Sequence, residues 1–189
     1  MPNWSSNTLI AKADPSNPES VNQLAEFMQK IHAAEKSERG IFTQFFPCPQ
    51  DLYDNPGNGF DTWYSWHVAN WGTKWDVRYG GVNFSESKDD ATVQMWFNTA
   101  WSPPLVFVKE VSLLYPLLSF RLAYSEGGMG FAGYMDFAAG AEVGDEFEVE
   151  NVSWDYPTNE AGEEDEEADP EPSEAWTAFM EEYGLHTGG

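Results

Sequence analysis

The sequence predicts an α+β protein with a ferredoxin-like split β-α-β fold, in which an antiparallel sheet carries two helices on one face. Two helical patterns alternate with strand-like segments in the order β–α–β–β–α–β, followed by one extra strand. The composition, with 41% hydrophobic and 16% aromatic residues, supplies a packed core. A length of 189 residues suits one such domain with an appendage.

The domain is predicted to begin with a strand and a helix. Residues 3–10 have strand-like composition, and Asn17 followed by Pro18 favours a helix start. Gly40 is expected to end this helix. Its apolar residues recur at three- and four-residue steps, as one face of a helix requires: Val21, Leu24, Phe27, Met28 and Ile31.

The next part of the chain is predicted to be a loop and a short Trp-rich helix. Residues 42–60 are interrupted by Pro and Gly, which favours a loop. Residues 61–76 are expected to form a short helix that ends in a turn at Gly72. Because Lys74 is the only basic residue among these tryptophans, we expect core packing, with Lys74 over a ring, rather than stacking on nucleic-acid bases.

The second half of the domain is predicted to hold a strand pair, a helix and two more strands. The strands of the pair are expected at 75–87 and 91–101, where apolar residues alternate. Ser102 is predicted to cap the helix that follows, with Pro103 at its first position. The last two strands are expected at 117–126 and 129–140.

The C-terminal part has a different composition, which divides the chain into a domain at 1–154 and an acidic appendage at 155–189. Pro, Gly, Ala and acidic residues at 155–173 favour a linker or arm. The segment that follows has apolar residues at helical spacing, namely Trp176, Phe179, Met180 and Tyr183. So short a helix must dock, either on its own domain or on a partner.

Charge is distributed unevenly along the chain. The net charge is −23, and residues 122–189 carry 19 acidic residues and no Lys or Arg, whereas residues 1–121 carry 13 acidic and 9 basic residues. Carboxylates repel phosphates, so nucleic acid and anionic membranes are poor partners for this surface. A basic protein surface is the partner that this charge favours.

The acidic run can imitate the charge spacing of a nucleic acid. An extended chain advances ~3.3–3.6 Å per residue, and a nucleic-acid strand carries one charge per ~3.4 Å. Glu146, Glu148 and Glu150 alternate and are expected on one side of a strand. The residues predicted to bind a partner are Glu142, Asp145, Glu146, Glu148, Glu150, Glu160, Glu163, Glu164, Asp165, Glu166, Glu167, Asp169, Glu171, Glu174, Trp176, Phe179 and Tyr183.

No pattern for catalysis, metal or cofactor binding stands out. The three histidines lack metal-ligand spacing and are expected to be isolated surface residues: His32, His67 and His186. Cys48 lies between two prolines with no basic neighbour to activate it. Asp136 lies among many acids without an electrophile, which favours a solvated acidic face. We therefore predict a protein that is not an enzyme and uses no cofactor or metal.

The sequence favours a cytoplasmic location. A single cysteine excludes an internal disulfide and suggests a reducing compartment. The first ten residues lack the basic and apolar regions of a signal peptide, and no stretch approaches ~20 apolar residues.

Several Trp-containing blocks resemble the YubB-like family of phage and plasmid proteins. These are MPNW at 1–4, NWGTKWD at 70–76 and FNTAWSPP at 97–104, and YSEGGMGFAGY at 124–134 resembles the Gly-rich strand pair of that family. The resemblance implies a ferredoxin-like domain and a mobile-element origin, and it implies no catalytic residue. The sequence departs from the family at Ser5, where Cys is expected, and in its acidic C-terminal arm.

Our functional hypothesis is a phage or mobile-element inhibitor that acts in the cytoplasm of the bacterial host. It would mimic nucleic acid and occupy the basic surface of a host defence protein, such as a CRISPR effector or a restriction enzyme. Two alternatives stay open. One is a structural or assembly protein with a solubilising acidic tail, and the other is an enzyme with an unrecognised carboxylate site around Asp136 and the Trp-rich turn.

Overall fold

The computed structural model describes residues 3–37, 39–54, 62–158 and 168–187. The elements of this part are β1 (Trp4–Lys12), α1 (Pro18–Ala33), a 3-10 turn (Ala34–Lys36), α2 (Ile41–Phe45), α3 (Gln50–Asp54), α4 (Trp63–Trp71), a second 3-10 turn (Tyr79–Gly81), β2 (Asn83–Ser87), β3 (Thr92–Ala100), α5 (Leu105–Leu114), β4 (Ser119–Glu126), β5 (Phe131–Ala138), β6 (Ala141–Glu142), β7 (Phe147–Glu148), β8 (Trp154–Asp155), β9 (Glu171–Pro172) and α6 (Glu174–Tyr183).

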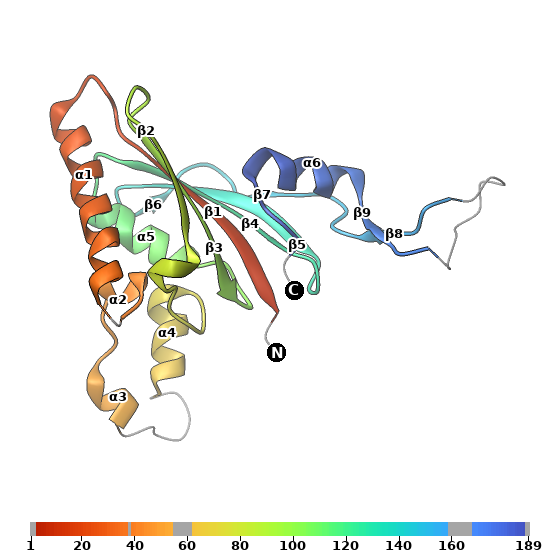
Figure 1. Ribbon diagram of the computed structural model, residues 1–189, viewed down its shortest axis with the longest axis horizontal. Helices are drawn as coiled ribbons and strands as arrows, with labels where there is room; N and C mark the ends of the chain where they lie inside the picture. Colours follow the sequence, from red (N-terminus) through yellow and green to blue (C-terminus); the bar gives the residue numbers. More distant parts are fainter. Residues whose placement is uncertain (1–2, 38, 55–61, 159–167, 188–189) are drawn as a thin grey trace.

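The main sheet has the strand order β2-β3-β1-β4-β5-β6, and all of its pairings are antiparallel. Two β-α-β units interleave, because β3 lies between β1 and β2 while β1 lies between β3 and β4. This arrangement confirms the predicted ferredoxin-like fold, with β5 as the extra strand. Figure 1 shows α1 and α5 on one side of the sheet and α6 on the other.

The larger core lies between the sheet and the helices α1, α2, α4 and α5. The predicted face of α1 is buried at Leu24, Phe27, Met28 and Ile31, whereas Val21 at the helix start is exposed. Asn17 accepts hydrogen bonds from the backbone N–H groups of residues 19 and 20, as the predicted N-cap requires. Alternate residues of β3 and β4 face this core, among them Met95 and Leu122.

A second, smaller core lies on the opposite face of the sheet, beneath α6. The Trp176 ring is fully buried over Ala123 and Ala132, whose small side chains leave room for the indole. Its Nε1 donates a hydrogen bond to Ser125 Oγ at 2.8 Å. At the other end of α6, the Tyr183 carbonyl oxygen accepts hydrogen bonds from Thr8 and Trp96 side chains. The C-terminal helix therefore docks on its own domain.

The strands β8 and β9 lie on either side of the acidic run in the sequence and pair with each other. Trp154 and Asp155, on either side of the predicted boundary between 1–154 and 155–189, form β8 together and pair with β9. The Trp154 ring meets the Trp176 ring edge-to-face at 5.2 Å. The β8–β9 pair lies at the end of the molecule far from α1 (Figure 1). The segments on either side of residues 159–167 therefore pair with each other beside α6.

Several local expectations were wrong. The predicted loop at 42–60 contains α2 and α3, and the strand predicted from residue 75 begins only at Asn83. Ser102 does not cap α5, because its hydroxyl donates to the Gly72 carbonyl at 2.6 Å, and the helix begins after Pro104 without a side-chain cap. The predicted Trp-rich helix and its Gly72 turn are confirmed as α4, which ends at a left-handed Gly72.

The Trp-rich turn packs largely as expected, but His67 is not on the surface. Trp71 is fully buried, and Lys74 Nζ lies 4.4 Å from the centre of the Trp101 ring. His67 is only 4% exposed and stacks on Trp71 at 3.9 Å. Its burial follows from its position one turn before Trp71 on the inner face of α4.

None of the helices in the described part of the chain has both the length and the apolar character needed to cross a membrane.

We expect Trp176→Ala to lower the free energy of unfolding by about 3–5 kcal/mol, because it empties a fully buried site and removes the partner of Ser125. Urea unfolding followed by tryptophan fluorescence measures this loss. Glu181→Gln, at an exposed position on the same helix, is the matched control and should change stability by less than about 0.5 kcal/mol. A loss of the same small size for both variants would contradict the docking of α6.

We expect His67 to make stability depend on pH. Burial lowers the pKa of His67 below its ordinary value of 6.5, against opposing effects of the Lys74 carbonyl and the nearby Asp76. The unfolded chain therefore binds the proton first, so stability present above about pH 6.5 is lost as the pH falls through the folded pKa. His67→Gln should flatten this slope, which has a ceiling of about 1.4 kcal/mol per pH unit for one group.

Urea unfolding at pH values between about 7 and 5 measures the slope. Asn22→Gln, which changes an exposed side chain of α1 that does not titrate, is the control and should keep the slope of the unmodified protein. Equal slopes for His67→Gln and the unmodified protein would show that His67 does not titrate between the two states.

Candidate protein-interaction surface

The short strand β7 lies against β5 because Gly133 leaves space for it. Phe147 and Glu148 pair with Tyr134 and Gly133, and the Val149 N–H donates to the Ala132 carbonyl at 2.9 Å. A Cβ atom at position 133 would overlap the Phe147 carbonyl oxygen. A glycine is thus required where the two backbones approach most closely.

Four aromatic rings surround a groove between β7 and α6, which we call the acidic groove. Tyr134 stacks on Phe147 at 5.0 Å, and Phe147 stacks on Phe179 at 6.0 Å. The Tyr183 ring completes the set, because its centre lies 4.9 Å from that of Phe179 and 6.0 Å from that of Tyr134. The groove has a volume of about 590 Å³.

Three glutamates line this groove, and they give it its charge. Glu148 and Glu150 come from β7 and the residues after it, and Glu182 comes from α6. All three are exposed. Glu182 was not among the predicted partner-binding residues, although its place beside Tyr183 on a docked helix is the signal that would have identified it.

Arg121, the last basic residue of the chain, lies at the floor of the groove and is already paired. Its guanidinium makes a bidentate ion pair with Asp136, with both N–O distances at 2.7 Å, and lies 3.9 Å from the centre of the Tyr134 ring. It also donates to the Tyr183 hydroxyl at 3.1 Å. The pKa of Arg121 is raised, chiefly by the Asp136 hydrogen bonds. Arg121 therefore offsets Asp136 and leaves the charge of the three glutamates uncompensated.

On the other side of β7, Glu146 and Glu148 line a smaller cavity of about 330 Å³. The Tyr124 hydroxyl donates a hydrogen bond to Glu146 there. Burial raises the pKa of Tyr124, and the Glu146 carboxylate raises it further. The predicted alternating row is thus only partly formed, since Glu146 lines this cavity, Glu150 lines the acidic groove, and Glu148 lines both.

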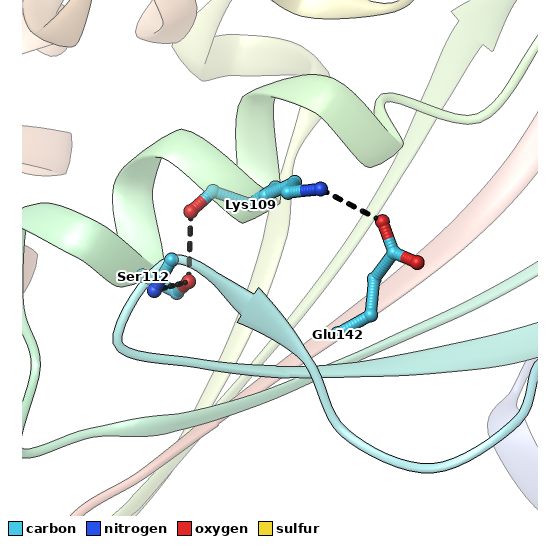
Figure 2. Close-up of polar contacts among 4 residues, drawn as sticks. Lys109, Ser112 and Glu142 are labelled. Atoms are coloured by element: carbon cyan, nitrogen blue, oxygen red, sulfur yellow. Dashed lines mark hydrogen bonds and ion pairs between the residues drawn. The ribbon is translucent and has the colours of Figure 1, made fainter.

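Glu142 is paired within the chain rather than free. Lys109 on α5 lies with its Nζ 2.9 Å from Glu142 Oε1, as Figure 2 shows. Ser112, one turn along α5, donates to the Lys109 carbonyl and accepts the Gly140 N–H at 2.9 Å. This network fixes α5 to the β5–β6 turn and removes much of the charge of Glu142 from the acidic surface.

The remaining predicted acids divide into two groups. Asp145, Asp169, Glu171 and Glu174 are exposed, as an acidic surface requires. Six predicted residues lie outside the described part of the chain, namely Glu160, Glu163, Glu164, Asp165, Glu166 and Glu167. β8 and β9 hold the two ends of that segment next to each other.

The three predicted aromatic contacts need a correction. Trp176 is fully buried, and Phe179 and Tyr183 are each 6% exposed. Their rings pack on the chain's own sheet, because the second face of that sheet offers the apolar surface that the helix requires. Phe179 and Tyr183 line the acidic groove, whereas Trp176 lies beneath the helix and does not line it.

The carboxylate at the centre of the enzyme alternative is paired within the chain. Asp136, the centre of the enzyme alternative, has both carboxylate oxygens bound by Arg121. Within the described ranges, no three His, Cys, Asp or Glu side chains come together in a way that would hold a metal ion.

The fold defines an α+β protein with a ferredoxin-like domain, and one family model matches it. That model is described as the ferredoxin-like domain in Api92-like protein and matches residues 74–170, more than half of the chain. The chain belongs to this family. The match runs from before β2 to just before β9, so α1 and α6 lie outside it.

One solved structure is similar, the crystal structure of a protein api92 from Yersinia pseudotuberculosis. The similarity covers 78% of this chain and 98% of that chain, with a TM-score of 0.48 and 10% sequence identity. No curated protein matches the chain. The family model confirms the ferredoxin-like domain implied by the sequence resemblance, in the Api92-like family.

We expect Gly133→Ala to displace β7 while leaving the sheet intact. The added methyl group overlaps the Phe147 carbonyl, so the hydrogen bond from Val149 N–H to Ala132 is lost. Hydrogen exchange should show faster exchange at 147–149 and unchanged protection in β1 and β4. Gly81→Ala is the control, because a Cβ there meets no atom within 4 Å. Unchanged exchange at 147–149 would show that Gly133 does not position β7.

Proposed function

We propose that this protein is an acidic nucleic-acid mimic from a phage or other mobile element, which occupies the basic surface of a host defence nucleoprotein. The mobile-element origin rests on the YubB-like resemblance of the sequence, and CRISPR effectors and restriction enzymes are the target class. The observation that carries the proposal is the acidic groove. Glu148, Glu150 and Glu182 line it together with aromatic side chains, and its lining contains no unpaired basic residue.

The position of the groove supports a function in binding. Its glutamates come from two elements that are fixed to the sheet, β7 through its pairing with β5 and α6 through its buried face. Carboxylates carried by a packed frame lose little backbone entropy on binding, which favours affinity. A solubilising tail needs no such fixed arrangement.

The chemistry of the groove suits Lys and Arg side chains. Arg121 already lies over the Tyr134 ring, at 3.9 Å from its centre, which shows that these rings accept a guanidinium. A basic side chain of a partner would meet Phe147, Phe179 and the three carboxylates in the lining of the groove. Proteins that bind nucleic acid present many such side chains on one surface.

Exposed acids next to α6 extend the same surface. β9 carries Glu171 and is followed at once by α6 with Glu174, and both residues are exposed. β9 pairs with β8, and this pair lies at the end of the molecule far from α1 (Figure 1). The charges of Glu171 and Glu174 are thus added on the α6 side of the molecule.

The proposal is tested with full-length variants, because removing the chain after Tyr156 would also remove α6 and expose the second core. The first variant is Glu148→Gln with Glu150→Gln and Glu182→Gln, and the second replaces the acids of residues 160–174 with Gln or Ser. The matched control for the first is Glu19→Gln with Glu26→Gln and Glu110→Gln, three exposed residues of α1 and α5. All are used to capture proteins from a bacterial lysate at low and high salt.

We expect the unmodified protein and the control to retain a nucleic-acid-binding protein that high salt releases. Affinity for that purified partner should fall roughly tenfold for the first variant, because three surface charge contacts are lost. DNA should compete with the protein for the partner. Equal retention of the partner by both acidic variants and the control, or binding of partner and DNA together, would contradict mimicry and favour a solubilising function for the acids.

A further inference from the structure

A second cavity lies at the opposite end of the molecule and has the opposite chemistry. It has a volume of about 610 Å³ and is formed by α2, α3 and the segment between α4 and β2. The residues that matter to its chemistry are Arg39, Thr43, Tyr53, Trp75, Asp76 and Arg78. The acidic groove shares none of them.

Two arginines give this cavity a positive rim in a chain of net charge −23. Arg39 and Arg78 both line it and are both exposed. Neither forms an ion pair with a carboxylate within the described residues, whereas Arg121 and Lys109 each do. Two guanidinium groups offer the paired N–H donors that bind a phosphate group with two oxygens each.

The one carboxylate in the cavity wall is occupied by the backbone. Asp76 Oδ1 accepts the N–H groups of Phe42 and Val77, each at 2.7 Å, and Oδ2 accepts the Thr43 N–H at 3.0 Å. A Cβ atom at Gly40 would overlap this carboxylate. A glycine at position 40 therefore leaves the space that the Asp76 carboxylate needs to reach the start of α2. Asp76 therefore holds the wall together, and its oxygens are directed to backbone donors rather than to a ligand.

A buried histidine fixes Tyr53 in the wall. His67 Nδ1 must carry a hydrogen, because its partner at 2.8 Å is the Lys74 carbonyl, which only accepts. Nε2 is then the acceptor, and the Tyr53 hydroxyl donates to it at 2.8 Å. This hydrogen bond from the Tyr53 hydroxyl to His67 fixes the position of the Tyr53 ring in the cavity wall.

An aromatic side chain completes the cavity. Trp75 lines it with 37% of its surface exposed, next to Trp4 at 5.9 Å between ring centres. Lys74 Nζ lies over this ring, 4.8 Å from its centre, so a ligand would use the opposite face. Tryptophan faces bind flat rings by stacking, and a tryptophan in one cavity with two arginines suits a molecule with one flat ring and one phosphate. A volume of several hundred Å³ is in the range of sites for small molecules of that size.

We propose that this cavity binds a nucleoside monophosphate, with the phosphate held by Arg39 and Arg78 and the base against Trp75. The site goes beyond the proposed mimicry and is independent of it, because it uses a different end of the molecule. Binding here neither requires nor prevents binding of a basic partner at the acidic groove.

The probe is adenosine 5′-monophosphate, titrated into the full-length protein by calorimetry, with inorganic phosphate and adenosine in separate titrations. We expect saturable binding of adenosine 5′-monophosphate and at least tenfold weaker binding of each of the other two. Arg39→Gln with Arg78→Gln should weaken binding about tenfold or more. Trp75→Leu should weaken binding of the nucleotide and leave that of phosphate unchanged.

Lys12→Gln with Lys88→Gln is the control, because it removes the same charge from exposed positions that do not line this cavity. It should bind the nucleotide as the unmodified protein does. The proposal is overturned by absence of saturable nucleotide binding, by equal loss in the control and the arginine variant, or by phosphate alone binding as tightly as the nucleotide. Circular dichroism of each variant verifies that it is folded.

Discussion

The burial of Trp176 against the second face of the sheet is the interaction on which the acidic half of the molecule depends. Ala123 and Ala132 make room for the indole, and Ser125 satisfies its N–H. Without this contact α6 loses its most deeply buried side chain, and a ten-residue helix is not stable in water by itself. The acidic groove and the β8–β9 pair both follow from the docked helix.

The same packing explains how the chain tolerates so much like charge at its C-terminal end. Self-repulsion of 19 acidic residues without a basic one opposes a compact state. The chain offsets it with apolar burial, because Phe179, Met180 and Tyr183 face the sheet while Glu181 and Glu182 face water. Arg121 also stabilises this end of the molecule. From β4 it binds Asp136 and the Tyr183 hydroxyl and lies over the Tyr134 ring.

Periodicity was enough to predict the fold, because each main element carries its own pattern. The buried face of α1 and the alternation of Val93, Met95 and Phe97 in β3 are local signals, because each element must bury its apolar side chains whichever element packs against it. Contacts between distant segments left no such signal. Ser102 had the residue type and position of an N-cap, yet its hydroxyl donates a hydrogen bond to the carbonyl of Gly72, thirty residues earlier.

The candidate sites were predictable only in part for the same reason. Acidic residues were identified from composition, but which of them share a groove depends on the pairing of β7 with β5 and on α6 crossing above it. The pairing of Tyr53 with His67 and the arginine-lined cavity depend on how α3 and α4 pack, and no spacing in the sequence encodes that.

The β8–β9 pair has a consequence for how this protein can change over generations. Opposed residues of an antiparallel pair have Cα atoms about 4.5–5.5 Å apart, so the acidic segment begins and ends at nearly the same point. Doubling the length of a segment closed in this way costs only about 0.6 kcal/mol. Insertions and deletions between Asp155 and Glu171 therefore leave the frame almost undisturbed, and the amount of charge it carries can be varied separately from the fold.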